Sequence, residues 1–144
     1  GHGAEAFFDL ADQLRDSRHV VLAAVRRDRP WLRHSPVLAA ASERLRRDQA
    51  VVLAAVSARP KSLEYADPEL QDDKKVVLEA AKGDVYSFEF ASWCLRDDET
   101  IVRSAVENTD EREEYVVLKF ATDRLRDNGD LVLWVLERYL GTMW

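Results

Sequence analysis

The residues with the most reactive side chains in this sequence are one cysteine and three histidines. Cys94 has no histidine or basic cluster near it in the sequence that would activate its thiol. His2, His19 and His34 show no paired metal-ligand spacing, and the chain contains no glycine-rich phosphate loop and no GxSxG motif. The carboxylates recur where helices are expected to begin, and capping is a sufficient role for them. We therefore expect no enzymatic activity, no cofactor and no metal site.

An arginine or glutamine recurs at one position of a pattern that runs through the chain. The series consists of Arg15, Arg46, Gln71, Arg96 and Arg126. Equivalent side chains in stacked units would form a line, and a line of guanidinium groups could bind an acidic peptide or phosphates. Alternatively, each arginine pairs with a capping aspartate of its own or an adjacent unit. We favour this second arrangement, because the carboxylates recur in the same register.

A basic segment with one aromatic residue spans residues 26–34. Its positive positions are Arg26, Arg27, Arg29, Arg33 and, when protonated, His34, and its aromatic residue is Trp31. Arginine together with tryptophan suits contacts with nucleic acid or other anions. In the alternative, which we favour, the segment is a surface loop that packs Trp31 onto the neighbouring helices and leaves its arginines in solvent.

Two further tryptophans, Trp93 and Trp134, occupy positions that other units fill with polar or small residues. An exposed tryptophan at such a position is the residue type that anchors protein interfaces. The alternatives are that a longer helix, made possible by an insertion at residues 109–115, covers Trp93, and that Trp134 packs against Trp144.

The charge of the chain is divided unevenly along its length. The net charge is −6, but residues 1–62 carry 11 Lys and Arg against 7 Asp and Glu (+4), and residues 63–144 carry 10 against 20 (−10). Such a division could steer partners or promote head-to-tail self-association. It could equally be variation on a solvated surface, which we favour.

The elements that position these residues come from a short unit that recurs five times. We number the copies 1 to 5 by their central leucines, which are Leu14, Leu45, Leu70, Leu95 and Leu125. Successive central leucines are 31, 25, 25 and 30 residues apart. The basic unit therefore has 25 residues, with insertions of six and five.

Copy 3 predicts the local structure of a unit. Leu63, Ala66 and Leu70 are spaced for one helical face, but Pro68 interrupts that helix because it lacks an amide donor. Capping residue types precede this break in four copies: Ser42, Asp67, Ser92 and Thr122. We predict a short helix, a capped turn and a second helix in each copy.

The second helix is expected to begin near Asp16, Asp48, Asp72, Asp97 or Asp127. In copy 3 it ends at Gly83 and carries a broad apolar stripe, consisting of Val76, Val77, Ala80 and Ala81. The position four residues before the central leucine is Leu10, Ala41, Ala66, Ala91 or Ala121, and the four alanines indicate that backbones approach closely there.

One helical pair is too small to bury its own apolar face, so neighbouring units must stack. With only 5 Gly and 4 Pro, a β-sandwich or barrel is unlikely, and the longest apolar run, residues 50–56, is too short to span a membrane. We expect an all-α fold, an α-solenoid or superhelical stack of about ten short helices. Residues 4–144 form the array, and residues 1–3 are expected to be a tag remnant.

The repeated unit resembles a known family. The strings LEYADPELQDDKKVVLEAA over residues 63–81 and FEFASWCLRDDE over residues 88–99 resemble the tandem helical repeat called domain of unknown function 4116. The resemblance spans about residues 7–138 and implies helical repeats, with no established activity, cofactor or partner. Copy 1 departs from the pattern at Leu10, and copy 5 departs at Asn128, Gly129 and Trp134, as terminal units would.

These features together predict a scaffold that binds a macromolecule, and a protein is the expected partner. The rival is an anion or nucleic-acid binder that uses the basic segment 26–34, with Arg46 and Arg47 as possible additions. No membrane contact is expected, and a single cysteine fits an intracellular location. The sequence leaves the oligomeric state open.

Overall fold

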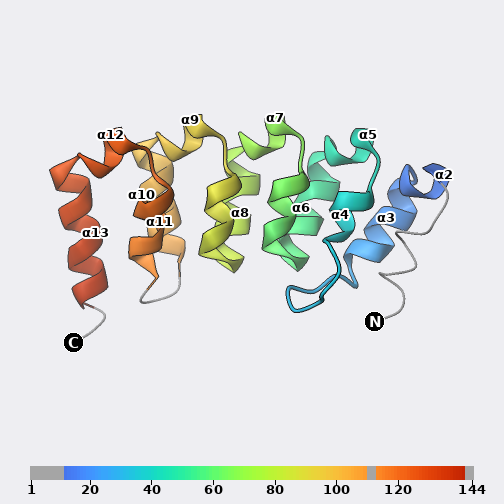
Figure 1. The fold of residues 1–144 in the computed structure, drawn as a ribbon, viewed down its shortest axis with the longest axis horizontal. Helices are drawn as coiled ribbons and strands as arrows, with labels where there is room; N and C mark the ends of the chain where they lie inside the picture. Colours follow the sequence, from blue (N-terminus) through green and yellow to red (C-terminus); the bar gives the residue numbers. More distant parts are fainter. Residues whose placement is uncertain (1–11, 110–112, 142–144) are drawn as a thin grey trace.

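The computed structural model describes residues 12–109 and 113–141, and every regular element in these ranges is a helix (Figure 1). In chain order these elements are α2 (Asp12–Arg15), α3 (Arg18–Val25), α4 (Val37–Ala40), α5 (Glu43–Arg46), α6 (Gln49–Ala58), η1 (Pro60–Tyr65), α7 (Pro68–Gln71), α8 (Lys74–Gly83), η2 (Val85–Phe90), α9 (Trp93–Arg96), α10 (Glu99–Asn108), α11 (Glu114–Phe120), α12 (Asp123–Arg126) and α13 (Gly129–Gly141). The predicted all-α class is confirmed. No helix within these ranges combines the length and apolar character that a membrane span requires.

Each of copies 2 to 5 has three helical pieces where the sequence predicted two. The predicted capped turn is itself a four-residue α-helix: α5, α7, α9 or α12. One turn is enough because the cap side chain satisfies a free amide, as Ser42 does for Leu45 at 3.4 Å and Asp67 does for Glu69 at 3.0 Å. The predicted number of about ten helices is therefore too low. The described ranges hold twelve α-helices and two 3-10 helices.

The copies lie in a row that follows the chain from one end to the other (Figure 1). Among the long helices, α3 contacts α6, α6 contacts α8, and α8 contacts α10. The first pieces of the copies, α4, η1, η2 and α11, make a second line of successive contacts. The short helices α5, α7, α9 and α12 lie along one edge of the row (Figure 1).

Each long helix carries two apolar columns. The first column contains Val51, Val76, Ile101 and Leu131, and the second contains Val52, Val77 and Val102, and all of these side chains are buried. In α3 the second column is buried at Val21 but the first is only half-buried at Val20. In α13 the order is reversed, since Leu131 is fully buried and Val132 is half-buried. The first column therefore faces the preceding copy and the second faces the following copy.

Most of the long helices begin one residue later than predicted. Asp48 is the N-cap of α6 as expected, but Ser17, Asp73 and Asp98 cap α3, α8 and α10. In copy 5 the Asn128 side chain accepts from the Leu131 amide at 3.1 Å, so Asp127 is not the cap. The long helices thus begin near the predicted residues, but Asp16, Asp72, Asp97 and Asp127 are not themselves the caps.

Three of these four carboxylates bind the following copy instead. Asp16 accepts from the Ser42 hydroxyl at 2.6 Å, and Asp72 accepts from the Ser92 hydroxyl at 2.5 Å. Asp97 accepts in the same way from Thr122 at 2.5 Å. Backbone hydrogen bonds of 2.8–3.2 Å accompany all four junctions, from the amides of Ser42, Asp67, Ser92 and Thr122 to the carbonyls of Arg15, Arg46, Gln71 and Arg96. Each junction is therefore closed by a main-chain bond.

Close backbone approach explains the predicted alanine column and one glycine. Ala41, Ala66, Ala91 and Ala121 are all buried, whereas Leu10 lies outside the described residues. Gly83 ends α8 as predicted. A β-carbon placed on Gly83 would lie 2.6 Å from Cγ of Pro60, so glycine is required there by the contact between α8 and η1.

Candidate interaction surfaces

A pocket of about 430 Å³ lies between copies 4 and 5, where the four-residue helices α9 and α12 adjoin. We call it the Trp93 groove, and its lining residues are Trp93, Arg96, Asp97, Ala121, Thr122, Asp123, Arg124 and Arg126. Three residues singled out from the sequence, Trp93, Arg96 and Arg126, are thus brought together. The junction between the two copies is what assembles them.

Trp93 is the first residue of α9, directly after the N-cap Ser92. Its side chain remains 63% exposed. The alternative in which a longer helix covers this ring is therefore wrong: α11 packs against η2, α10 and α13 instead. Most of the surface of this side chain is therefore accessible to solvent.

Arg96 lines the groove from the last residue of α9. Its Nε donates to the carbonyl oxygen of Ala91 at 3.1 Å, which ties the side chain to the preceding segment. Its terminal nitrogens form no hydrogen bond or ion pair with the described residues. The guanidinium is thus oriented by the fold and has donors left for a ligand.

The other two arginines of the groove are engaged by carboxylates. Arg124 donates to Asp97 at 3.0 Å, and Arg126 forms an ion pair with Asp123 of its own copy. The Thr122 hydroxyl and then Arg124 hold the pKa of Asp97 below its usual value of 3.8. Asp97 therefore stays ionised at neutral pH and keeps Arg124 in place.

A matching but smaller pocket of about 210 Å³ lies between copies 2 and 3. Its lining includes Glu43, Arg46, Ala66, Asp67 and Pro68, which are the counterparts of Trp93, Arg96, Ala121, Thr122 and Asp123, together with Tyr65. The main difference is at the first position, where glutamate replaces tryptophan. The groove is therefore a recurring feature of the junctions, and the exposed aromatic ring distinguishes the one between copies 4 and 5.

The predicted pairing of the recurring arginines with aspartates holds only in part. Arg126 pairs with Asp123, but Arg96 bonds to a backbone carbonyl, and Gln71 donates to the carbonyls of Leu63 and Glu64 at 3.0 and 3.2 Å. Arg15 is half-buried at the first junction. Among the ion pairs between described residues, those of Arg18, Arg44, Arg47 and Arg124 reach a carboxylate of a neighbouring copy. Sequence reasoning missed this set. Serine or threonine at three of the four cap positions could have indicated that a carboxylate of the neighbouring copy lies opposite.

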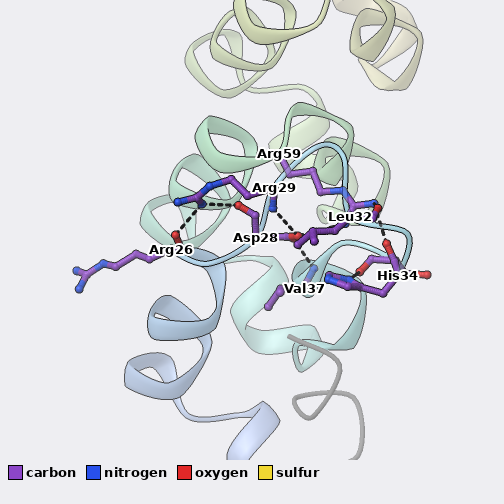
Figure 2. A network of polar contacts seen from close by, with 8 residues as sticks. Arg26, Asp28, Arg29, Leu32, His34, Val37 and Arg59 are labelled. Carbon is purple, nitrogen blue, oxygen red and sulfur yellow. Dashed lines mark hydrogen bonds and ion pairs between the residues drawn. The ribbon is translucent and has the colours of Figure 1, made fainter. Parts of the chain in front are cut away.

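The basic segment forms a loop that is held in place by the hydrogen bonds of a buried carboxylate. We call residues 26–36 the Trp31 loop. Asp28 is 1% exposed and accepts from the amide of Val37 at 2.8 Å, the amide of Arg29 at 3.0 Å and the guanidinium of Arg59 at 3.1 Å (Figure 2). Arg59 also donates to the carbonyls of Leu32 and His34 at 3.2 and 2.8 Å (Figure 2). The path of the loop is therefore set by Asp28 and Arg59.

Trp31 stands out from this loop into solvent, with 76% of its surface exposed. The prediction that Trp31 packs onto the neighbouring helices is therefore wrong. Arg26, Arg27, Arg29 and Arg33 are exposed as predicted. The structure places these residues far along the row from the Trp93 groove, so the two sets are separate surfaces (Figure 1).

A family model described as Domain of unknown function (DUF4116) matches the chain twice, over residues 18–71 and 48–96. Together the two matches cover more than half of the 144 residues. The chain belongs to this family. No curated protein and no solved structure matches it.

The two DUF4116 matches follow the copies. The first runs from α3 to α7 and the second from the cap of α6 to α9. Each match thus begins at a long helix and ends with a four-residue helix. Copy 5, which supplies one wall of the Trp93 groove, lies beyond the matched residues.

Trp134 lies on the last helix of this DUF4116 chain and is half-buried. Its ring lies 4.6 Å from the guanidinium carbon of Arg103 and 5.2 Å from that of Arg138. These cation–π contacts give it a packing role within copies 4 and 5. Its predicted alternative partner, Trp144, lies outside the described residues.

The described part of the chain gathers no group of three or more His, Cys, Asp and Glu side chains that could hold a metal ion. His34 contacts the carbonyl oxygen of Ser35 through Nδ1 at 2.6 Å, and Cys94 is exposed.

Proposed function

We propose that the chain is an α-solenoid that binds another protein, without enzymatic turnover, through the Trp93 groove. In this role the protein would be an intracellular interaction module. It needs no cofactor, because the binding energy would come from complementary surfaces extending over neighbouring copies.

The solenoid part of the proposal is supported by the way burial changes along the chain. Each inner long helix has both apolar columns buried, and each outer one has only a single column fully buried. A stack in which each inner copy packs on two neighbours and each end copy packs on one produces this pattern. The backbone bond at each of the four junctions supports the same arrangement.

The observation that carries the binding proposal is the exposed ring of Trp93 beside the oriented guanidinium of Arg96. Tryptophan and arginine are the residue types that most often dominate the energy of protein interfaces. Both residues line the Trp93 groove, whose volume is about 430 Å³. A partner segment with an apolar side chain next to a carboxylate would use the indole ring and the free guanidinium nitrogens together.

The test is selection of displayed peptides on the intact chain, followed by measurement of Kd for the selected peptides. We expect Trp93→Ala to weaken binding by about 30-fold or more, as loss of an interface anchor does. Arg96→Gln should weaken binding most for peptides that carry a carboxylate. Trp31→Ala is the matched control, because it also removes an exposed tryptophan but from a separate surface.

The result that would contradict the proposal is unchanged affinity of Trp93→Ala for every selected peptide, with circular dichroism showing the same fold. The proposal would also be contradicted if the selected peptides lost affinity for Trp31→Ala but kept it for Trp93→Ala, because they would then bind at the Trp31 loop and not in the Trp93 groove.

A further inference from the structure

The Trp31 loop contains a buried charge pair beneath an exposed surface. The side chains of Arg59 and Asp28 are 12% and 2% exposed, and their ion pair of 3.1 Å joins the end of α6 to the middle of the loop (Figure 2). A buried ion pair is no better for stability than apolar packing of the same volume, but it demands one geometry. The pair therefore specifies the conformation of a loop that lies on the surface.

The hydrogen bonds around Asp28 fix the backbone of the loop on both sides of Trp31. Arg59 holds the carbonyls of Leu32 and His34, and Arg29 Nη1 donates to the carbonyls of Arg26 and Asp28 at 2.8 and 2.6 Å. The loop thus presents Trp31 from a pre-ordered backbone. Binding through a pre-ordered loop has a smaller entropic cost than binding through a mobile one.

The charges that remain on the outside of this loop are all positive. Asp28 is its single acidic residue, and that carboxylate is buried and paired. The side chains of Arg26, Arg27 and Arg33 are exposed and make no hydrogen bond or ion pair with the described residues. Lys61 lies beside the loop, where it lines a small pocket with Pro30, Arg59, Pro60 and one carboxylate, Asp84. A chain of net charge −6 therefore carries a cationic site here.

We propose that the Trp31 loop binds single-stranded nucleic acid, with the Trp31 ring stacking on a base and Arg26, Arg27 and Arg33 contacting phosphates. An exposed aromatic ring among unpaired cations suits single-stranded nucleic acid. The ring can stack on any base, and the cations can contact the negatively charged phosphates that join the nucleotides. This site is independent of the Trp93 groove.

Two other anionic partners fit the loop less well. An anionic membrane surface would need several apolar side chains to insert, but Trp31 is the one large apolar side chain that the loop exposes, since Leu32 is half-buried. An acidic peptide would use the cations but would leave the face of the ring without a flat partner. Both partners are alternatives that the test distinguishes.

The test is fluorescence anisotropy of a labelled single-stranded 12-mer across a range of salt concentrations. Three phosphate contacts predict a slope of log K against log salt of about −2. Trp31→Ala should weaken binding by about 5- to 100-fold, which corresponds to the loss of one stacked base. The triple variant Arg26→Ala, Arg27→Ala, Arg33→Ala should abolish most of the salt dependence.

The matched control is the triple variant Lys74→Ala, Lys75→Ala, Lys82→Ala, which removes the same charge from exposed positions on α8. It should keep the affinity and the salt slope of the wild-type chain. A second control is the melting curve of each variant, which should be unchanged because none of these side chains is buried.

Several results would overturn the proposal. One is the absence of salt-dependent binding at low ionic strength. Equal affinity for a duplex of the same sequence would exclude stacking on Trp31, because duplex bases are already stacked. Binding to vesicles with anionic lipids, or to a poly-glutamate peptide, in the absence of oligonucleotide binding would assign the loop to one of the other partners.

Discussion

Arg47 donates through Nε to the carboxylate of Asp67 at 2.9 Å, across the junction between copies 2 and 3. At the other three junctions the acidic residue belongs to the earlier copy, as Asp97 does opposite Thr122. The donor and the acceptor carboxylate are therefore exchanged between the two sides of this junction. Asp67 also caps α7, so it serves two structural roles at once.

The first prediction is a charge exchange at this junction. Arg47→Asp alone should lower Tm by a few degrees, because two carboxylates would then face each other. The double variant Arg47→Asp, Asp67→Ser reproduces the arrangement of Asp72 and Ser92 and should recover most of the loss. Thermal melts of the wild type, both single variants and the double variant test this. Additive losses in the double variant would contradict the coupling.

The second prediction concerns acid. The pKa of Asp16 is lowered by the Ser42 hydroxyl and then by Arg44, and the pKa of Asp97 is lowered by Thr122 and then by Arg124. A pKa below the unfolded value of 3.8 means that the stabilisation is complete above that value and is lost as pH falls through the lower folded pKa. Denaturant unfolding should show falling stability below about pH 5. Asp97→Asn should reduce the pH dependence, and an unchanged acid limb in this variant would refute the assignment.

The third prediction concerns the buried pair beneath the Trp31 loop. Asp28→Ala should lower the free energy of unfolding by about 3–5 kcal/mol, because it leaves Arg59 buried without a counter-charge. Arg59→Met should cost a similar amount, and the double variant should cost less than the sum of the two. Denaturant titration measures all three. Arg27→Ala is the control, with an expected change within about 0.5 kcal/mol, since this side chain is exposed.

The fourth prediction concerns the contact between Gly83 and Pro60. Gly83→Ala should destabilise the fold by about 1–3 kcal/mol, although alanine is the better helix former, because its methyl group would overlap the proline ring. Gly129→Ala is the matched control. Nothing lies within 4 Å of its added β-carbon, so this variant should be neutral or stabilising by up to about 1 kcal/mol. Equal effects of the two substitutions would contradict the close approach.

The fifth prediction tests the two-column arrangement with one residue type at matched positions. Val102 is 0% exposed, whereas its counterpart Val132 in the last copy is half-buried. Val102→Thr should cost about 1–3 kcal/mol, because its hydroxyl would enter an apolar column. Val132→Thr should cost less than half as much. Chemical denaturation measures both variants. An equal loss of the free energy of unfolding would contradict the arrangement, because it would mean that Val132 is as buried in solution as Val102.

Several parts of the structure could be predicted from residue spacing because they depend on neighbours in the chain. The apolar stripe Val76, Val77, Ala80 and Ala81 specified the buried face of α8, and Pro68 after Asp67 marked the start of a new helix. Such signals arise from backbone geometry and capping within a few residues. They also allowed Trp93 and Arg96 to be singled out as candidates, and the structure places both in the Trp93 groove.

The sequence by itself determined the class of the fold, the places where helices break and the apolar stripe of α8, since periodicity and capping are local properties. Tertiary structure alone decided which side of each junction holds the carboxylate, why position 83 is glycine, and that Trp93 and Trp31 stay exposed. These outcomes depend on atoms about 20 to 30 residues away in the chain, such as Asp97 opposite Thr122 and Gly83 against Pro60. The contact between Asp97 and Thr122 forms only when neighbouring copies pack. The contact between Gly83 and Pro60 forms only when α8 packs against η1 of the same copy, so local spacing encodes neither contact.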